Sequence, residues 1–333
     1  MYKISIILPC FNVEKYIERS FKSILNQTMD LEDIEVIMVD DCSTDNTKNI
    51  IKEYEKKYLN FKAVFHEKNS GGCGIPRNSG LKIANGKYIM FLDPDDEYAL
   101  DMCEVMYNKI EETGVDLVRC NHERITPSFS RLVYMLDKDI DEIKINCKTD
   151  LPPGCAVWNV IHRKSFLDEK NIIFSDLKSM EDILFTTTEH VNTDYIVCLN
   201  NYHGYKYYFY EKSTLSSRPT KDNLDAVLSS FNLTKKLLES RNRPDIIKHI
   251  FSKISVSFFM RLLNCNTHKK LYLKKFYEFE KSLSVDLNMN YTWAEILNKM
   301  IMNKQFTLAV LYMDTLKYIR VSPLNKFYQK LLK

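Results

Sequence analysis

The sequence predicts an α/β fold in which a mostly parallel sheet, covered by helices on both faces, is followed by a helical C-terminal domain. Two observations lead to this prediction. Over the first 120 residues, short runs of β-branched and aromatic residues alternate with longer amphipathic segments, as they do in proteins built from βαβ units. After about residue 220, apolar residues recur at helical spacing through several long segments.

Strands and helices are expected to alternate in the first part of the chain. The expected strands are residues 4–8, 34–39, 61–65, 88–92 and 117–120, and the expected helices are residues 13–25, 46–58 and 76–84. Thr44 or Asp45 is a suitable N-cap for the second helix, and Pro76 suits the first turn of the third. Helical periodicity then marks residues 222–240, 245–264, 268–283, 292–301 and 303–318.

Length and charge divide the chain near the same point. A chain of 333 residues predicts about two domains. Residues 1–214 carry a net charge of −9, whereas residues 215–333 carry +12. We therefore expect an acidic domain over residues 1–215 and a basic helical domain over residues 216–333.

The composition, 45% hydrophobic and 27% charged, is typical of a globular protein that folds in water. No apolar run approaches the roughly 18 residues that a membrane-spanning helix needs. The apolar residues 4–9 are too few for a signal peptide. The nine cysteines are odd in number and include no CxxC pair, so they do not indicate a disulfide framework. A cytoplasmic protein is expected.

Four polar clusters lie at loops that follow expected strands. They are Pro9-Cys10-Phe11-Asn12, Asp40-Asp41-Cys42-Ser43, the glycine-containing residues 69–78, and Asp93-Pro94-Asp95-Asp96. Because the carboxyl ends of parallel strands share one edge of a sheet, the clusters should converge there. Pro94 ends the fourth strand, and hard carboxylate oxygens two residues apart suit Mg²⁺ or Mn²⁺ carrying a diphosphate.

Each cluster alone has a simpler explanation. Asp40 and Asp41 could be a helix N-cap with a neighbouring charge, Gly71 and Gly72 a flexible turn, and residues 93–96 a solvated acidic turn. The glycine-containing loop matches neither the P-loop nor the dinucleotide-binding spacing. Together, however, the clusters describe a nucleotide site with an aromatic wall, a carboxylate for the base, an arginine for phosphate and a metal.

Residues 6–12 (Ile-Ile-Leu-Pro-Cys-Phe-Asn), 39–45 (Val-Asp-Asp-Cys-Ser-Thr-Asp), 76–78 (Pro-Arg-Asn) and 91–96 (Phe-Leu-Asp-Pro-Asp-Asp) resemble the motifs of family 2 of the glycosyltransferases. The resemblance covers about residues 3–215. It implies the GT-A fold, a Rossmann-like sheet, with a nucleotide-sugar half in residues 1–96 and an acceptor and base half in residues 97–215. It also implies a nucleotide-activated sugar donor and inversion at the anomeric centre. Residues 69–78 are similar to those of wall-teichoic-acid glycosyltransferases that add N-acetylglucosamine to poly(ribitol phosphate).

The resemblance implies roles for five residues in donor binding. Phe11 would stack on the base, Asp41 would accept a hydrogen bond from an N–H of the base, and Pro9 would shape that wall. Asn69 and Arg77 would contact phosphate or sugar. The planar, permanently charged guanidinium suits a diphosphate.

Metal binding is implied for the Asp93–Asp96 segment. Asp95 would ligate Mn²⁺ or Mg²⁺, and Asp93 would reach the ribose or the sugar. Asp93 or Asp96 could share the metal, because the register of the two aspartates varies between family members. The metal and Arg77 would then neutralise charge on the leaving nucleoside diphosphate.

Residues 180–185 resemble the family's ED motif at the start of a helix that faces the donor. An inverting transfer needs a group that deprotonates the acceptor hydroxyl. Asp182 is expected to be this base, and Glu181 to orient it or bind an acceptor hydroxyl. A helix N-terminus stabilises a carboxylate anion and weakens it as a base, unless burial raises its pKa again. Alternatively, both residues could be ordinary first-turn acids.

The function expected from the resemblance is metal-dependent transfer of a hexose or N-acetylhexosamine from a UDP-sugar. The acceptor would be a cell-surface polysaccharide, a teichoic-acid-like polymer or a lipid-linked glycan. A sugar-1-phosphate nucleotidyltransferase is an alternative, although the loop after Pro9 lacks the glycine-rich arginine-lysine signature of that class. A non-catalytic protein with the same fold is another. A glycosidase would leave the nucleotide clusters unexplained.

The basic C-terminal domain leaves several partners open. It could be a solvated helical surface, or it could attract an anionic acceptor or the inner face of the plasma membrane. Lys269, Lys270, Lys274 and Lys275 interleave with Leu271, Leu273, Phe276 and Tyr277, as in a membrane-surface helix. No nucleic-acid-binding motif accompanies the charge, and an oligomer is compatible with the sequence.

Two further features were weighed for the acceptor side. Trp158 could stack on an acceptor sugar or pack in the core, with neither favoured. Residues 213–217 are expected to form a loop that orders over the donor.

Overall fold

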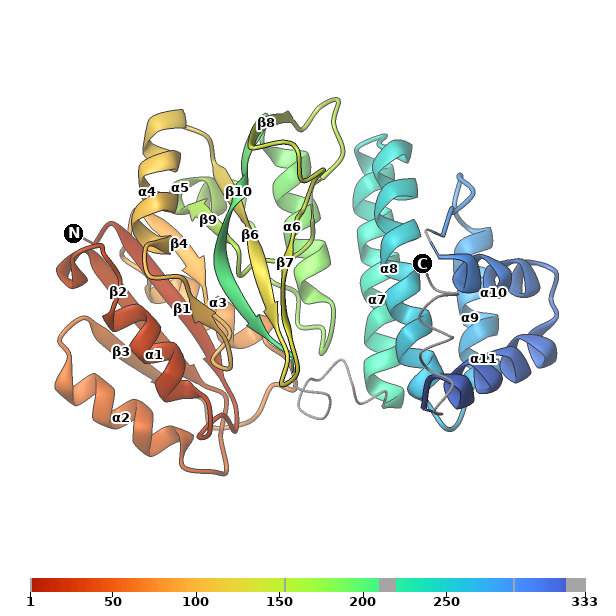
Figure 1. Cartoon of the computed structure of the whole chain (residues 1–333), viewed down its shortest axis with the longest axis horizontal. Helices are drawn as coiled ribbons and strands as arrows, with labels where there is room; N and C mark the ends of the chain where they lie inside the picture. Colours follow the sequence, from red (N-terminus) through yellow and green to blue (C-terminus); the bar gives the residue numbers. More distant parts are fainter. Residues whose placement is uncertain (1, 153, 210–219, 290, 322–333) are drawn as a thin grey trace. The chain divides into compact units, whose positions relative to one another are not determined.

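The computed structural model describes residues 2–152, 154–209, 220–289 and 291–321. It divides into two compact units, Met1–Tyr210 and Glu211–Lys333 (Figure 1). The expected domain boundary at residue 215 and the expected loop at residues 213–217 lie outside the described residues.

The first unit is built on one ten-stranded sheet. Its spatial order is β3-β2-β1-β4-β9-β6-β10-β5, with β7 paired to β6 and β8 to β10. The strands are β1 (Ile4–Cys10), β2 (Ile34–Asp40), β3 (Phe61–Phe65), β4 (Tyr88–Phe91), β5 (Glu97–Tyr98), β6 (Leu117–Ile125), β7 (Ser130–Val133), β8 (Glu142–Asn146), β9 (Val160–Arg163) and β10 (Tyr195–Tyr208).

The sheet is parallel in its first half and mixed in its second. β3, β2, β1 and β4 run parallel, whereas β9 is antiparallel to both β4 and β6, and β6 is parallel to β10. The predicted α/β fold is therefore confirmed, but its mostly parallel character applies to residues 4–91. The regular alternation of strand and crossover helix extends only that far, and β9 enters between β4 and β6 without a crossover helix before it.

Helices cover both faces of the sheet. They are α1 (Ile17–Leu25), the short 3₁₀ helix η1 (Leu31–Asp33), α2 (Thr47–Lys57), α3 (Gly74–Ile83), α4 (Met102–Thr113), α5 (Lys164–Glu169) and α6 (Glu181–Asn192). Side chains of α1, α2 and α4 share a buried cluster with Ile4, Ile6 and Leu8 of β1. Side chains of α5 and α6 share a second cluster with Ile7 of the same strand. Successive residues of a strand point to opposite faces, so β1 contributes to both cores.

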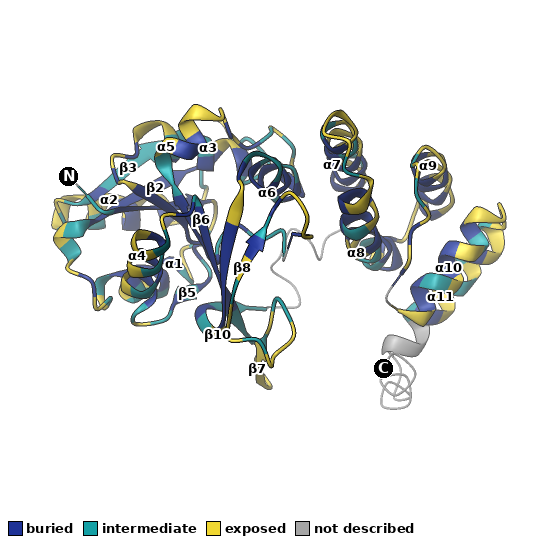
Figure 2. Cartoon of the chain, turned by 90° about the horizontal axis from the view of Figure 1, so that it is seen from above, coloured by how far each residue is buried: buried dark blue, intermediate teal, exposed yellow. Residues whose placement is uncertain are grey.

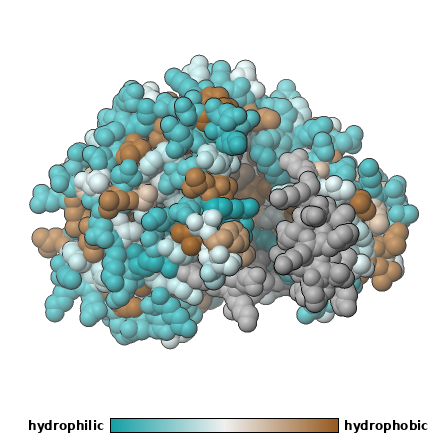
Figure 3. Space-filling model, viewed as in Figure 1, coloured by the Kyte–Doolittle hydropathy of each residue, from teal (hydrophilic) through white to brown (hydrophobic). Residues whose placement is uncertain are grey.

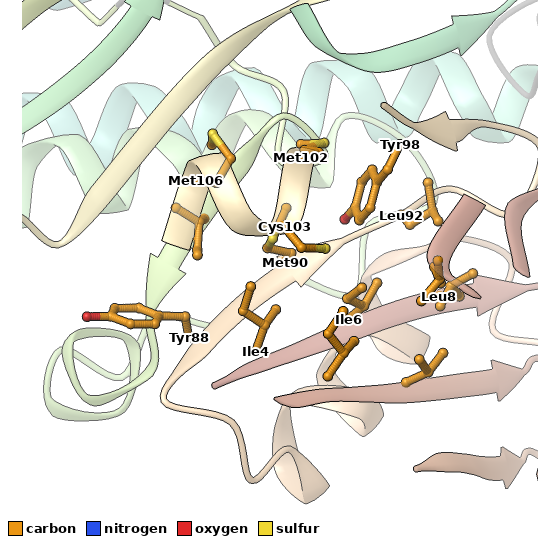
Figure 4. Close-up of a cluster of buried hydrophobic side chains, with 14 of the residues drawn as sticks. Ile4, Ile6, Leu8, Tyr88, Met90, Leu92, Tyr98, Met102, Cys103 and Met106 are labelled. Carbon is orange, nitrogen blue, oxygen red and sulfur yellow. The ribbon is translucent and has the colours of Figure 1, made fainter. Parts of the chain in front are cut away.

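Figure 4 shows the first of these cores at close range. Met102, Cys103 and Met106 of α4 lie over side chains of β1 and β4, and all of them are fully buried. Burial of both faces explains why the central strands read as continuous apolar runs rather than as alternating ones. Figure 2 shows the same distribution, with buried residues along the sheet and exposed residues on the outer sides of the helices.

The second unit is helical throughout the residues described. Its helices are α7 (Lys221–Ser240), α8 (Pro244–Asn264), α9 (Lys269–Lys281), α10 (Thr292–Met302) and α11 (Phe306–Val321). The hydroxyl of Thr220 caps α7 by accepting a hydrogen bond from the backbone N–H of Asn223. Phe231 of α7 packs against Phe251 and Phe258 of α8. These five helices match the predicted segments closely.

The suggestion of a membrane-surface helix at α9 is not supported by the packing. Leu273, Phe276 and Tyr277 are buried within the unit, and only Leu271 of the apolar set is exposed. The apolar side of α9 is therefore part of the helical core. Among the described helices, none combines the length and apolar character required to cross a bilayer. On the face shown in Figure 3, hydrophobic residues are scattered among hydrophilic ones.

Candidate active site

The loops after β1 and β2 are joined at one edge of the sheet. The two strands are in register up to the pair Cys10 and Asp40. Beyond that pair, the backbone N–H of Asp41 donates to the Cys10 carbonyl (2.8 Å), and the side-chain oxygen of Asn12 accepts from the backbone N–H of Thr44 (2.7 Å). Asn12 has a positive φ of 52°, which asparagine tolerates better than most residues. The first two clusters therefore converge as predicted.

Phe11 and Pro9 differ in the solvent exposure of their side chains. Phe11 follows β1 and has 45% of its surface exposed, so its ring is available to a ligand. Pro9 is buried within β1, in register with Val39 of β2. Its side chain is thus not open to a ligand, and its predicted part in a base-binding wall stays a prediction.

Asp41 is buried and held by several donors. Its Oδ1 lies 2.8 Å from Nδ1 of His66, and its Oδ2 accepts from the backbone N–H (2.9 Å) and hydroxyl (2.8 Å) of Ser70. Asn69 donates from its side-chain amide to the Asp41 carbonyl at 2.9 Å. Asn69 thus braces the loop that carries Asp41, and its predicted contact with phosphate or sugar stays a prediction.

The glycine-containing loop packs tightly against residues 174–178. A Cβ on Gly72 would lie 2.8 Å from the Leu177 carbonyl oxygen, and one on Gly74 would lie 2.4 Å from that of Ser175. Such distances are below ordinary van der Waals contact, so only glycine fits at both positions without a shift of the backbone. Asn78 adds a pair of hydrogen bonds, of 2.8 and 2.9 Å, with the backbone of Phe174. The glycines therefore permit close approach of two backbone segments.

The segment Asp93–Asp96 forms a turn that α1 holds in place. The backbone N–H of Asp96 donates to the Asp93 carbonyl at 3.0 Å. The hydroxyl of Ser20 lies 2.8 Å from the Pro94 carbonyl oxygen and 2.6 Å from that of Asp96. The guanidinium of Arg19 donates to the carbonyl of Asp95. Neither Arg19 nor Ser20 was singled out from the sequence.

The three aspartates of this turn have different surroundings. Asp93 and Asp95 are half-buried, whereas Asp96 is buried. Both oxygens of Asp96 accept hydrogen bonds, one from the hydroxyl of Tyr205 and one from the backbone N–H of Tyr208, each at 2.7 Å. These two bonds hold the Asp96 carboxylate in the interior of the unit, and its predicted share in a metal site stays a prediction. Burial, and then the negative charge of Asp93, raise the pKa of Asp95 to about 6.

Arg77 of α3 bridges the two halves of the unit. It is almost fully buried, with Nη2 2.8 Å from Asp93 and Nη1 2.9 Å from Glu181. Its guanidinium also lies over the ring of Phe174, 5.2 Å from the ring centroid. Arg77 thus faces two carboxylates here, and its predicted contact with phosphate stays a prediction. The spacing of motifs in the sequence did not predict that Arg77 would be buried between these two carboxylates.

Glu181 and Asp182 begin α6, as their resemblance to a helix-start motif implied. Met180 precedes them with a positive φ of 59°. Asp182 is half-buried, and its Oδ1 accepts from the backbone N–H of Ile183 at 3.0 Å. Burial, followed by the charge of Glu181, raises the pKa of Asp182 to about 7, while the charge of Arg77 opposes the shift. A carboxylate with a pKa near neutrality is suited to general-base work.

Comparison with known proteins agrees with this arrangement. Residues 5–169 match the model of the family described as glycosyl transferase family 2. The chain is 33% identical over 230 residues to the poly(ribitol-phosphate) beta-N-acetylglucosaminyltransferase TarP of Staphylococcus aureus, and the match covers 64% of this chain and 68% of TarP. The chain belongs to glycosyltransferase family 2.

A second relative is longer than this chain. It is 34% identical over 208 residues to the poly(ribitol-phosphate) beta-glucosyltransferase of Bacillus spizizenii, a match that covers 61% of this chain but 32% of that protein. The chain thus matches about a third of the length of that relative. The crystal structure of residues 1–349 of S. aureus TarS with UDP-GlcNAc superposes with a TM-score of 0.74 and 23% identity, over 95% of this chain and 92% of that one. This likeness confirms the GT-A fold with a helical C-terminal region.

The chemistry of the donor turn fits a divalent cation shared with a ligand. Asp93 uses Oδ1 for Arg77, which leaves Oδ2, and Asp95 contributes a second carboxylate. Among the described residues, no group of three or more His, Cys, Asp or Glu side chains is arranged to hold a metal ion. Mg²⁺ is commonly held by one or two carboxylates and completed by phosphate oxygens and water. Asp93 and Asp95 offer carboxylate oxygens of the kind that mode of binding uses, and their predicted metal binding stays a prediction.

An aromatic cluster from the second half of the unit contacts the Asp93–Asp96 turn. Trp158 stacks on Tyr205 with ring centroids 4.3 Å apart and on Tyr207 at 5.8 Å. The hydroxyl of Tyr205 in turn bonds Asp96. Trp158 is half-buried and packs on the core, so it supports the turn from the second half of this family 2 domain.

Proposed function

We propose that this chain carries the transfer centre of an inverting enzyme that moves a hexose or N-acetylhexosamine from a UDP-sugar to a hydroxyl of a polyol-phosphate polymer. The observation that carries the proposal is the position of Asp182. This carboxylate, with a pKa of about 7, is coupled to the charges of Arg77 and Asp93 at the edge of the sheet where the nucleotide clusters converge. Family membership and the activities after which TarP and the B. spizizenii relative are named support it.

In the proposed reaction, Asp182 accepts the proton of the acceptor hydroxyl as that oxygen attacks the anomeric carbon in line with the leaving diphosphate. The bond from the anomeric carbon to the diphosphate oxygen breaks, and UDP leaves. Glu181 is held by Arg77, so its negative charge stays beside Asp182 and keeps the pKa of Asp182 high. This placement favours proton transfer near neutral pH.

Recognition of a uracil base is supported by the hydrogen bonds of Asp41. A carboxylate offers about four lone-pair positions. The N–H and hydroxyl of Ser70 face Oδ2, and His66 faces Oδ1. One position on Oδ1 is left, which matches the single imide N–H of uracil. The exposed ring of Phe11, two residues after Pro9, supplies a surface for stacking.

A divalent cation is part of the proposal. Mn²⁺ or Mg²⁺ bound by Asp93 and Asp95 would offset the negative charge that develops on the leaving diphosphate. Burial and the charge of Asp93 raise the pKa of Asp95 against the opposing charge of Arg19, and a bound cation would favour its charged form.

The proposed acceptor is anionic, and the second unit presents the complementary charge. Lys270, Lys274 and Lys281 of α9 are exposed. Attraction of phosphate groups by such lysines is electrostatic, so acceptor affinity should fall as salt rises.

The experiment combines donor binding with turnover. Thermal midpoints are measured with UDP, other nucleoside diphosphates and a panel of UDP-sugars, with Mn²⁺ or with EDTA, because a ligand that binds only the folded state raises the midpoint. Release of UDP is then measured with poly(ribitol phosphate) as acceptor. We expect a shift with UDP that requires Mn²⁺ and is lost in Asp95→Ala, but not in the control Asp139→Ala, whose carboxylate lies in an exposed segment. A shift of the thermal midpoint that persists in EDTA would contradict the proposed role of the metal. If no nucleotide shifts the midpoint, the proposed function is wrong.

A further inference from the structure

His66 connects the carboxylate proposed to read the base with the helix that carries Arg77. Its Nδ1 lies 2.8 Å from Oδ1 of Asp41, and its Nε2 lies 2.9 Å from the hydroxyl of Ser79 in α3. All three side chains are buried or half-buried. His66 follows β3 directly, so its place depends on the register of β3 with β2, in which Phe65 pairs with Asp40.

We propose that His66 is a positioning residue that sets the nucleobase selectivity of the donor site. The inference rests on the proposed use of a UDP-sugar, and it assigns to His66 the choice of uracil over cytosine. His66 acts through Asp41 and does not itself contact the base.

The hydrogen bonds assign the tautomer of His66. Asp41 is an acceptor, so Nδ1 carries the proton that lies between the two residues. In the neutral ring, Nε2 is then the acceptor for the hydroxyl of Ser79. The ring is thereby fixed at both ends, and it fixes the rotation of the Asp41 carboxylate together with the two donors of Ser70.

The fixed carboxylate discriminates by what it can accept. Uracil presents an N–H between two carbonyl groups, which fits the one free lone-pair position on Oδ1. Cytosine presents a ring nitrogen without hydrogen at the equivalent position, and two acceptors would face each other without a proton between them. Unpaired or opposed polar groups of this kind are a strong means of rejecting the wrong ligand.

Without His66, the carboxylate would gain a second open position on Oδ1 and could rotate about the Ser70 contacts. It could then accept from the exocyclic amine of cytosine. Loss of the His66 side chain should therefore relax the selectivity between UDP and CDP, and not only weaken the binding of both.

Dissociation constants for UDP and CDP are measured by calorimetry in the full chain with Mn²⁺, for the wild type and three variants of His66. In His66→Ala, we expect the ratio of the CDP to the UDP constant to fall about tenfold, as for loss of one hydrogen bond to a charged group. His66→Asn places an amide N–H close to the former Nδ1 and should restore most of the ratio. His66→Gln places its amide near the former Nε2, facing Ser79, and should not. His249→Ala, in the second unit, is the control for the loss of a histidine.

The outcomes separate the inference from the function on which it rests. A wild type that binds no nucleotide overturns both. A wild type that prefers UDP, with the same CDP-to-UDP ratio in His66→Ala, overturns the role of His66 and leaves the donor assignment standing. A purely structural role would lower the thermal midpoint and weaken both ligands equally. If His66→Ala does not fold, equal ratios in His66→Asn and His66→Gln still overturn the inference.

Discussion

Nη1 of Arg77 lies 2.9 Å from Oε1 of Glu181, although 104 residues separate them in the chain. The other terminal nitrogen of Arg77 bonds Asp93. One guanidinium therefore ties the turn proposed to hold the metal to the helix that carries the proposed base. The proposed donor and acceptor sides of the site are thus connected through a buried cation.

Arg77→Ala should destabilise the first unit by about 3 kcal/mol, because it leaves two partly buried carboxylates without their cation. Arg77→Lys should cost less in stability but still weaken the bridge, since an ammonium cannot reach two carboxylates with a planar fork. Urea unfolding measures both. Arg131→Ala, at an exposed position of β7, serves as the control and should change the stability by less than about 0.5 kcal/mol. A loss in Arg77→Ala no larger than in this control would show that the bridge contributes nothing.

Turnover should rise with pH around a midpoint near 7, because Asp182 has to be deprotonated to accept a proton and its pKa is raised to about 7. The charge of Glu181 contributes to that rise, so Glu181→Gln should move the midpoint to lower pH. Asp182→Asn should reduce turnover by about a hundredfold or more and leave UDP affinity nearly unchanged. The measurement is the pH profile of kcat for UDP release. If the midpoint does not move in Glu181→Gln, the pH profile of kcat does not report the ionisation of Asp182.

Gly72→Ala should disturb the donor loop, because its Cβ would lie 2.8 Å from the Leu177 carbonyl oxygen and 2.9 Å from Cα of Lys178. Both atoms belong to the backbone and cannot turn away, so a loss of about 1–3 kcal/mol is expected, together with weaker nucleotide binding. Gly154→Ala is a matched control, since a Cβ there would meet no heavy atom within 4 Å. Comparable stability of the two variants in urea unfolding would exclude the predicted close packing.

The second unit should lose stability as pH rises, through Glu280. This buried side chain accepts a hydrogen bond from the amide of Asn298 at 2.8 Å, while its Oε2 and the Asn298 Oδ1 have no partner among the described residues. A buried carboxylate with one oxygen left without a donor favours the neutral, protonated form. Burial, with the charges of Asp286 and Glu295, raises the pKa of Glu280 to about 7.

The folded state therefore holds this proton at pH values where the unfolded state, with a glutamate pKa of about 4.3, has released it. The stabilisation is complete below that value and is lost as pH rises to about 7, by an amount on the order of 2 kcal/mol. Glu280→Gln keeps a donor beside Asn298 at every pH, so its stability relative to the wild type should increase between pH 5 and pH 8. Urea unfolding at both pH values checks this, and a constant difference between the two proteins would contradict it.

Local structure was largely predictable from the sequence. Residues 61–65 were expected to be a strand and form β3, and the five C-terminal segments became α7 to α11 with small shifts at their ends. α1 begins at Ile17 and not near Val13; in the segment before it, the backbone N–H of Val13 donates to the hydroxyl of Thr47 and that of Glu14 to Asp45. These contacts join two loops, and the periodicity of apolar residues does not predict such contacts.

The sequence by itself determined the alternation of strands and helices, the parallel edge where the four clusters meet, and the acids at the start of α6. Apolar periodicity, turn residues and motif order carry that information, and all of them are local. Only the tertiary structure decided that Asp96 is bonded to Tyr205 and Tyr208, that Arg77 lies between Asp93 and Glu181, and that His66 holds Asp41. Such pairings depend on strand register and on which loops pack together, so they are settled by contacts between residues far apart in the chain.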